Sequence, residues 1–122
     1  MTTAKITNLT KNITPVTVDV ADSFFLKLVG LMFRKSLHPH EGLLLSDKYE
    51  SKINSSIHML FMQFDICVIW IDKSFYVVDK KYARKWRPAY FPKKAAKYVL
   101  ELNATQINNY TIGDRLEIQY SN

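Results

Sequence analysis

Several short stretches of the chain place apolar side chains at every second position. This alternation occurs at residues 16–20, 98–102 and 116–120. A period of two predicts strands with one buried face. Residues 66–71 read ICVIWI, an unbroken apolar run typical of a strand buried on both faces. Strands are also predicted at 43–45, which is buried and very short, and at 75–78, which follows a hairpin-like turn after residue 71.

The remaining segments predict fewer regular elements. Asp22 or Ser23 can cap a helix. The apolar side chains that recur at helical spacing behind this cap are Phe24, Phe25, Leu28, Val29 and Met32. Residues 4–10 are polar-rich and predict a short edge strand, 46–56 a loop, and 104–109 a single helical turn. The expected fold is therefore α+β and mainly β. It is a compact curved sheet or partly open barrel of six or seven short strands with one substantial helix.

Composition is consistent with one intracellular domain spanning residues 1–122. The chain is 48% hydrophobic and 23% charged, as in ordinary globular proteins. Its single cysteine, Cys67, cannot form an internal disulfide. Its apolar runs are far shorter than the roughly 20 residues that span a bilayer. We expect a cytoplasmic protein without membrane association; oligomeric state stays open.

The positive charge is concentrated in one segment. The chain carries 17 basic and 11 acidic residues, for a net charge of +6. Eight of the basic residues lie between residues 80 and 97, where there is no acidic residue. The rest of the chain is slightly acidic, so the excess of positive charge belongs to this segment.

Within that segment, basic side chains alternate with aromatic ones. The candidate binding residues are Arg84, Lys85, Trp86, Arg87, Tyr90, Lys93 and Lys94. Basic groups neutralise phosphates and aromatic rings stack on bases, so the pattern predicts an anionic ligand or nucleic acid as partner. The alternative is a structural loop whose aromatics fold back onto the sheet. If residues 4–10 form an edge strand, a third hypothesis is an assembly module that pairs with another chain.

A second candidate site involves His58, Met62 and Asp65. A carboxylate beside a buried apolar run can form the charged end of a pocket with a histidine, or can cap a turn. The first case would suit a small enzyme of unknown reaction, with a cleft containing His58 and Asp65. Whether the chain is an enzyme stays open, and no catalytic residue is assigned.

Metal and thiol chemistry have weaker support in the sequence. His38 and His40 with Glu41 could be metal ligands, since alternate residues of an extended segment share a face, yet no motif with metal-ligand spacing accompanies them. We therefore expect no metal and no cofactor. Cys67 lies inside the apolar run, where burial suppresses the reactive thiolate. It is interpreted as a core residue rather than as a nucleophile paired with His58.

A set of motifs in a fixed order resembles one known family. The motifs are GLMFR at 30–34, EGLLL at 41–45, IHMLFM at 57–62, VIWID at 68–72, VLEL at 99–102 and GDRL at 113–116. Together they resemble domain of unknown function 192, the uncharacterised ACR proteins, over residues 16–118. The resemblance implies a compact, mainly β domain without an established activity. It also implies a connection at the basic segment for which nucleic-acid binding is not known.

The chain departs from this family pattern at three places. Members often carry an export signal, which is not apparent here. The central motif often has Trp-Met where this chain has His58-Met59, so a role inferred from that tryptophan would not transfer. The closing strand is usually followed by Ala-Gly, and Asn103-Ala104 here predicts a different turn.

Overall fold

A computed structural model describes residues 2–21, 30–32 and 34–121. In this part of the chain the regular elements are seven strands and one short 3-10 helix. In chain order they are β1 (Thr3–Asn8), β2 (Val16–Ala21), β3 (Gly42–Ser51), β4 (Ile66–Ile71), β5 (Val77–Ala83), β6 (Ala96–Asn103), η1 (Ala104–Asn109) and β7 (Leu116–Ser121).

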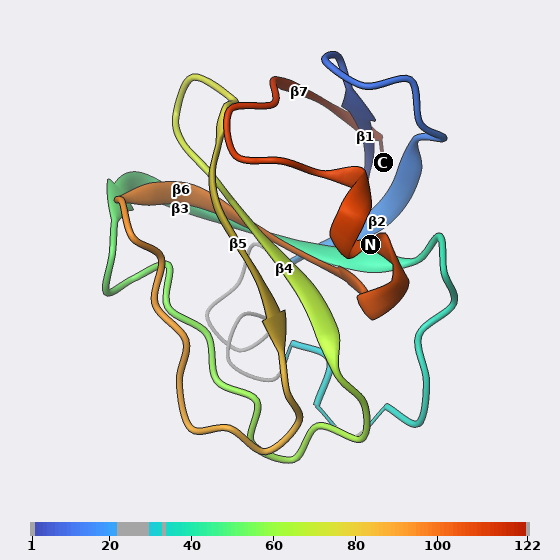
Figure 1. Cartoon of the computed structure of the whole chain (residues 1–122), viewed down its shortest axis with the longest axis vertical. Helices are drawn as coiled ribbons and strands as arrows, with labels where there is room; N and C mark the ends of the chain where they lie inside the picture. The colour runs from blue at the N-terminus through green and yellow to red at the C-terminus, as the bar shows by residue number, and fades with distance from the viewer. Residues whose placement is uncertain (1, 22–29, 33, 122) are drawn as a thin grey trace.

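All seven strands form one strongly curled sheet (Figure 1). Their order is β5-β4-β6-β3-β2-β1-β7, and the neighbours are antiparallel except for the parallel pair β2–β3. The two ends of the sheet approach each other. An isolated bridge joins Tyr76 to Arg115, and Leu116 N donates to Phe75 O at 2.8 Å. The sheet is therefore a half-barrel that is pinned at one end.

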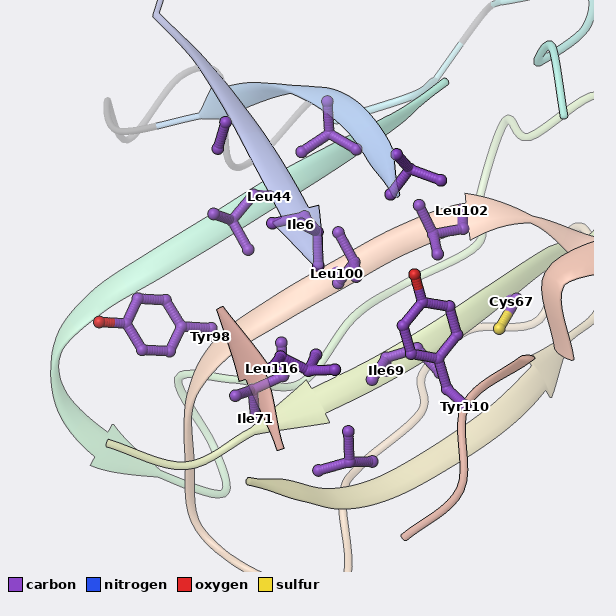
Figure 2. Packing of buried hydrophobic residues seen from close by; sticks show 14 of the residues in the cluster. Ile6, Leu44, Cys67, Ile69, Ile71, Tyr98, Leu100, Leu102, Tyr110 and Leu116 are labelled. Carbon is purple, nitrogen blue, oxygen red and sulfur yellow. The ribbon is translucent and has the colours of Figure 1, made fainter. Parts of the chain in front are cut away.

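The inside of the half-barrel holds the first hydrophobic core (Figure 2). Alternate residues of β4, Cys67, Ile69 and Ile71, point into it, together with side chains of the other six strands and Tyr110. The intervening β4 residues, Ile66, Val68 and Trp70, belong to a second core on the opposite face. Because β4 is covered on both sides, all six of its residues are buried, as the unbroken apolar run predicts.

The second core lies between the sheet and two irregular segments. Residues 31–37 supply Leu31 and Leu37, and residues 57–62 supply Ile57, Met59 and Met62. The indole Nε1 of Trp70 donates to the carbonyl of Ser55 at 2.7 Å, which ties this cover to the sheet. Among the described residues, the second face is therefore covered by loops, and these loops carry residues of both candidate sites.

The structure corrects several of the strand predictions. Residues 4–10 do not form an edge strand, because β1 lies between β2 and β7. β3 continues through Ser51, so part of the predicted loop 46–56 is strand. The edge position was wrong because strand order depends on long-range pairing. The loop prediction was wrong because polar side chains on the outer face of a sheet look like loop in a sequence, while their backbones still pair. The predicted helical turn at 104–109 is confirmed as η1.

The substantial helix is not confirmed. Of the residues chosen for it, Phe24, Phe25, Leu28 and Val29 lie outside the described residues, and residues 30–32 form a turn with Gly30 at φ 48°. In the described part of the chain the longest helix is η1, with six residues. The protein is therefore mainly β. No helix among the described residues has the length and apolar character needed to cross a membrane.

Candidate functional site

Two long connections pair with each other below the ends of β4 and β5 (Figure 1). We call residues 52–65, between β3 and β4, the covering loop, and residues 84–95, between β5 and β6, the basic loop. Ile57 and Tyr90 exchange both backbone hydrogen bonds, at 2.8 and 3.0 Å. Met59 donates to Arg87 O at 2.9 Å and accepts from Trp86 N at 2.7 Å. These four bonds hold the two loops as one unit.

Side-chain oxygens fix the remaining turns of the basic loop. Asp65 Oδ1 accepts from Lys85 N at 2.8 Å, and the Tyr90 hydroxyl accepts from Arg84 N at 2.8 Å. Buried Asp79 on β5 accepts from Lys93 N at 2.9 Å. A hydrogen bond to the Asp65 carboxylate, and its charge, raise the pKa of Tyr82. The backbone N–H groups of residues 84–87, 90 and 93 are thus paired, which gives the loop a defined shape.

The two loops together expose an aromatic pair. Phe61 and Trp86 contact each other edge-on, with ring centroids 5.2 Å apart. Trp86 is 51% exposed and Phe61 is 44% exposed. Both backbones are left-handed, at φ 69° and 62°. Non-glycine residues rarely adopt this conformation, and it costs free energy that the surrounding structure must supply. The covering loop therefore contributes half of an aromatic surface that the sequence placed in the basic segment alone.

The predicted binding residues differ in exposure. Arg84, Lys85, Arg87, Lys93 and Lys94 are all exposed. Tyr90 is buried in the second core, with the Arg87 guanidinium 5.7 Å from its ring centroid. Tyr90 therefore anchors the loop and offers no stacking face. The exposed aromatics near this surface are Tyr82, Trp86, Phe91 and Phe61.

A small pocket lies on the other side of the covering loop. Its volume is about 50 Å³, and it is partly open to solvent. The described residues that line it are Gly30, Leu31, Met32, Leu45, Ser56, Ile57, His58, Met59, Met62 and Glu101. The structure thus places His58 and Met62 on one pocket. Asp65 is not among these lining residues; its carboxylate binds the basic loop instead, so His58 and Asp65 do not share the pocket.

Glu101 is the carboxylate that the pocket contains. It lies on β6 beside Leu43 of β3 and Val68 of β4, and only 7% of its surface is exposed. Burial raises the pKa of Glu101 to about 7. Sequence reasoning missed this residue. Its position in the sequence could have indicated burial. Glu101 lies between Leu100 and Leu102, so in a strand covered on both faces it is buried as well.

The other chemical candidates lie apart from this pocket. Cys67 is fully buried in the first core, and burial raises the pKa of its thiol to about 12. His38 and His40 are exposed, and Glu41 accepts from the backbone N–H of His38 at 2.9 Å. Within the described residues, no three His, Cys, Asp or Glu side chains cluster as metal ligands would.

Comparison with known proteins identifies the family. A family model for domain of unknown function 192, described as uncharacterized ACR, matches residues 5–118. The chain belongs to this family. The match starts within β1 and ends within β7, so the DUF192 model includes at least part of every strand of the curled sheet. The family has no established activity, which leaves function to be argued from the site.

Relatives with the family name UPF0127 occur in species of Thermococcus and Pyrococcus. A protein of Thermococcus kodakarensis is 48% identical over 84 residues, which are 69% of this chain and 52% of that protein. One from Pyrococcus abyssi is 37% identical over 102 residues, or 82% of this chain and 84% of that protein. The chain thus spans about half the length of the first relative and most of the second.

Two crystal structures share the fold. A Sinorhizobium meliloti protein superposes with a TM-score of 0.81 at 19% identity, covering 96% of this chain and 92% of that one. A protein of unknown function from Novosphingobium aromaticivorans gives 0.75 at 18% identity, covering 94% and 83%. At these identities the likeness extends to the fold alone.

Proposed function

We propose that this DUF192 domain binds single-stranded nucleic acid through the face formed by the basic loop and Phe61. The observation that carries the proposal is the exposed Phe61–Trp86 pair, in which Trp86 lies between the exposed Arg84, Lys85 and Arg87 in the chain. Exposed aromatics give stacking faces that suit any base, and positive side chains track the phosphates. A domain of this kind binds its partner without catalysing a reaction.

The charges support this proposal because they are available to a partner. In the described part of the chain, salt bridges join Lys11 to Asp114 and Arg34 to Glu41, and none involves the basic loop. Arg84, Lys85, Arg87, Lys93 and Lys94 are therefore free of acidic partners among the described residues. Neutralising phosphates would release counterions, so affinity should fall steeply with salt.

The rigidity of the loop also supports binding. Its backbone hydrogen bonds to Met59 and Ile57, and those to the carboxylates of Asp65 and Asp79, hold the backbone of the loop that carries Trp86. A surface already held in its binding shape loses less conformational entropy on association. The left-handed backbone at these two exposed aromatic residues costs free energy, and such strained conformations are typical of binding surfaces.

The enzyme alternative has less support. Its two residues face different surroundings, since His58 lines the pocket and Asp65 accepts hydrogen bonds from Lys85 N and the Tyr82 hydroxyl. The assembly alternative relied on residues 4–10 as an edge, and β1 is an interior strand.

Fluorescence anisotropy with labelled oligo(dT) and oligo(U) tests the proposal, at salt from about 50 to 300 mM. We expect binding that weakens linearly on a log–log plot. Trp86→Gly should weaken binding about tenfold, because stacking on one base is worth roughly 1–3 kcal/mol. Quenching of tryptophan fluorescence would report Trp86 directly, since Trp70 is fully buried.

Two controls separate stacking from charge. Lys94→Ala and Lys5→Ala each remove one exposed lysine, on the basic loop and on β1 respectively, and only the first should weaken binding. Polyglutamate measures attraction to any polyanion. Equal affinity for polyglutamate and oligo(dT), with both unaffected by Trp86→Gly, would overturn the proposal, as would an absence of binding at 50 mM salt.

A further inference from the structure

Glu101 is a buried acid whose carboxyl group has no partner among the residues that the structure describes. Only 7% of its surface is exposed, and it lines the pocket. No hydrogen bond or ion pair joins its carboxyl group to another described residue, and burial is the cause of its raised pKa. Burying a carboxyl group without a partner costs several kcal/mol in a stable fold. Such a group points to something that the pocket receives.

The polar groups around the pocket favour a donor as that ligand. Ser56 donates its hydroxyl hydrogen to the Ile53 carbonyl at 2.7 Å, so its oxygen remains as an acceptor. Although the protein carries an excess of positive charge, no Lys or Arg is among the described residues that line the pocket. A ligand that brings hydrogen-bond donors and positive charge complements this lining.

The size and the walls define the rest of the ligand. A volume of about 50 Å³ admits a few water molecules or a small ligand of similar size. Leu31, Met32, Leu45, Ile57, Met59 and Met62 make the walls apolar. An alkyl substituent would pack against these side chains, and thioethers adapt readily to different shapes.

The geometry points to this pocket as a binding site for a small primary alkylamine, with the ammonium group on the Glu101 carboxylate and the alkyl chain against the methionines. The ammonium group supplies three donors to an acid that has none. A charge-assisted hydrogen bond of this kind is strong where water is excluded. This site faces the second core and is independent of the nucleic-acid surface.

The pH dependence of binding follows from two groups. Glu101 and His58 are the titratable side chains among the described lining residues; Leu43 and Val68, which flank Glu101 in the sheet, are apolar. Above pH 7 Glu101 is ionised and attracts the ammonium group, and below pH 7 it is protonated. Alkylamines stay cationic throughout. Affinity should rise about tenfold from pH 6 to pH 8.

Nuclear magnetic resonance titration with n-butylamine tests the site at pH 8 and 150 mM salt. We expect saturable shifts confined to residues at the pocket, 30–32, 45, 56–59, 62 and 99–102, and weaker shifts with n-butanol, which has the same chain without the charge. Glu101→Gln keeps the shape of the side chain and should lower affinity for butylamine at least tenfold. Glu117→Gln, an exposed acid on β7, is the matched control and should have no effect.

Three outcomes would overturn the inference: equal binding of butylamine and butanol, unchanged amine affinity in Glu101→Gln, or no saturable shift at 20 mM amine. The absence of a saturable shift would mean that the pocket holds water rather than an amine. His58→Gln tests the assignment of the pH dependence to Glu101, because the rise from pH 6 to pH 8 should remain in this variant. Oligo(dT) binding by Glu101→Gln should match the parent protein, so failure here and failure of the nucleic-acid proposal are distinguishable.

Discussion

The rings of Phe61 and Trp86 meet edge-on at 5.2 Å, and both residues hold left-handed backbone. The pair joins the covering loop to the basic loop at a point where Met59 also accepts a hydrogen bond from Trp86 N. The same covering loop lines the Glu101 pocket with His58 and Met59. One loop therefore presents an aromatic surface outward and a pocket wall inward.

Replacing Trp86 with glycine should change stability by less than about 1 kcal/mol. Glycine adopts φ 69° without the cost of roughly 1–2 kcal/mol that other residues incur, which offsets a half-exposed aromatic contact worth about 0.5–1.5 kcal/mol. Urea denaturation measures the difference. This variant thus removes the stacking face while leaving the fold in place.

Phe75→Gly is the matched control for that substitution. Phe75 is also left-handed, at φ 70°, but its ring stacks on Tyr98 at 5.5 Å and packs against the first core. Its loss should cost about 3 kcal/mol or more, because a large buried contact disappears. A loss of similar size in Trp86→Gly would show that the exposed ring is structural.

Gly42→Ala should destabilise the protein by about 1–3 kcal/mol. A Cβ at this position would lie 2.5 Å from the backbone oxygen of Glu101, 2.6 Å from Leu102 Cδ2 and 3.0 Å from Val18 Cγ1. The backbone oxygen cannot move without disturbing the β3–β6 pairing, so the overlap becomes strain. Thermal unfolding measures the loss. Gly113→Ala provides the contrast: nothing lies within 4 Å, and only its φ of 97° opposes alanine, at a cost of about 1 kcal/mol.

The sequence predicted the positions of the strands better than it predicted which strands pair in the sheet. Alternation at residues 16–20 and 116–120, and the apolar run at 66–71, correspond to β2, β7 and β4. Strand order depends on long-range pairing that no local pattern contains, so β1 was wrongly placed at an edge. The extension of β3 through Ser51 was missed for a related reason, because its outward side chains are polar.

The candidate sites were predicted in part. Exposure of the basic side chains follows from their charge, whereas the contribution of Phe61 needed the pairing of two loops that are distant in the chain. Asp65 looked like a pocket acid because it precedes a buried strand. The pocket acid is instead Glu101, whose burial depends on which strands flank β6.

Glu101 should make stability fall as pH rises. Its pKa is raised from the ordinary 4.5 to about 7 in the folded state, so the unfolded state ionises first. The contribution of Glu101 to the free energy of unfolding is fully present below pH 4.5 and is lost as pH rises through 7. The total loss is roughly 3 kcal/mol. Glu101→Gln should remove this fall and gain most at pH 8. Denaturant unfolding at pH 5 and pH 8 measures it.

Asp114→Asn is the control of opposite sign. Burial acts to raise the pKa of Asp114, but hydrogen bonds from Asn8, Thr111 N and Lys11, with the Lys11 charge, outweigh it and lower the pKa. A group whose pKa is lowered in the folded state stabilises the fold at pH values above its unfolded-state pKa. This stabilisation is lost as pH falls through the folded-state pKa. Asp114→Asn should therefore destabilise at both pH 5 and pH 8. A parallel pH response in the two variants would contradict the assignment.

Tyr110→Phe should stabilise the protein by about 1 kcal/mol. The Tyr110 hydroxyl is buried without a hydrogen-bond partner among the described residues, and its ring lies in the first core near Cys67 (Figure 2). A buried hydroxyl left unpaired costs about 1–3 kcal/mol, which phenylalanine avoids at nearly the same volume. Tyr90→Phe makes the same chemical change where the hydroxyl accepts from Arg84 N at 2.8 Å, and should lose about 1 kcal/mol. Urea unfolding of both variants measures two shifts that should have opposite signs, and shifts of the same sign would contradict the hydrogen-bond assignment at one of the two rings.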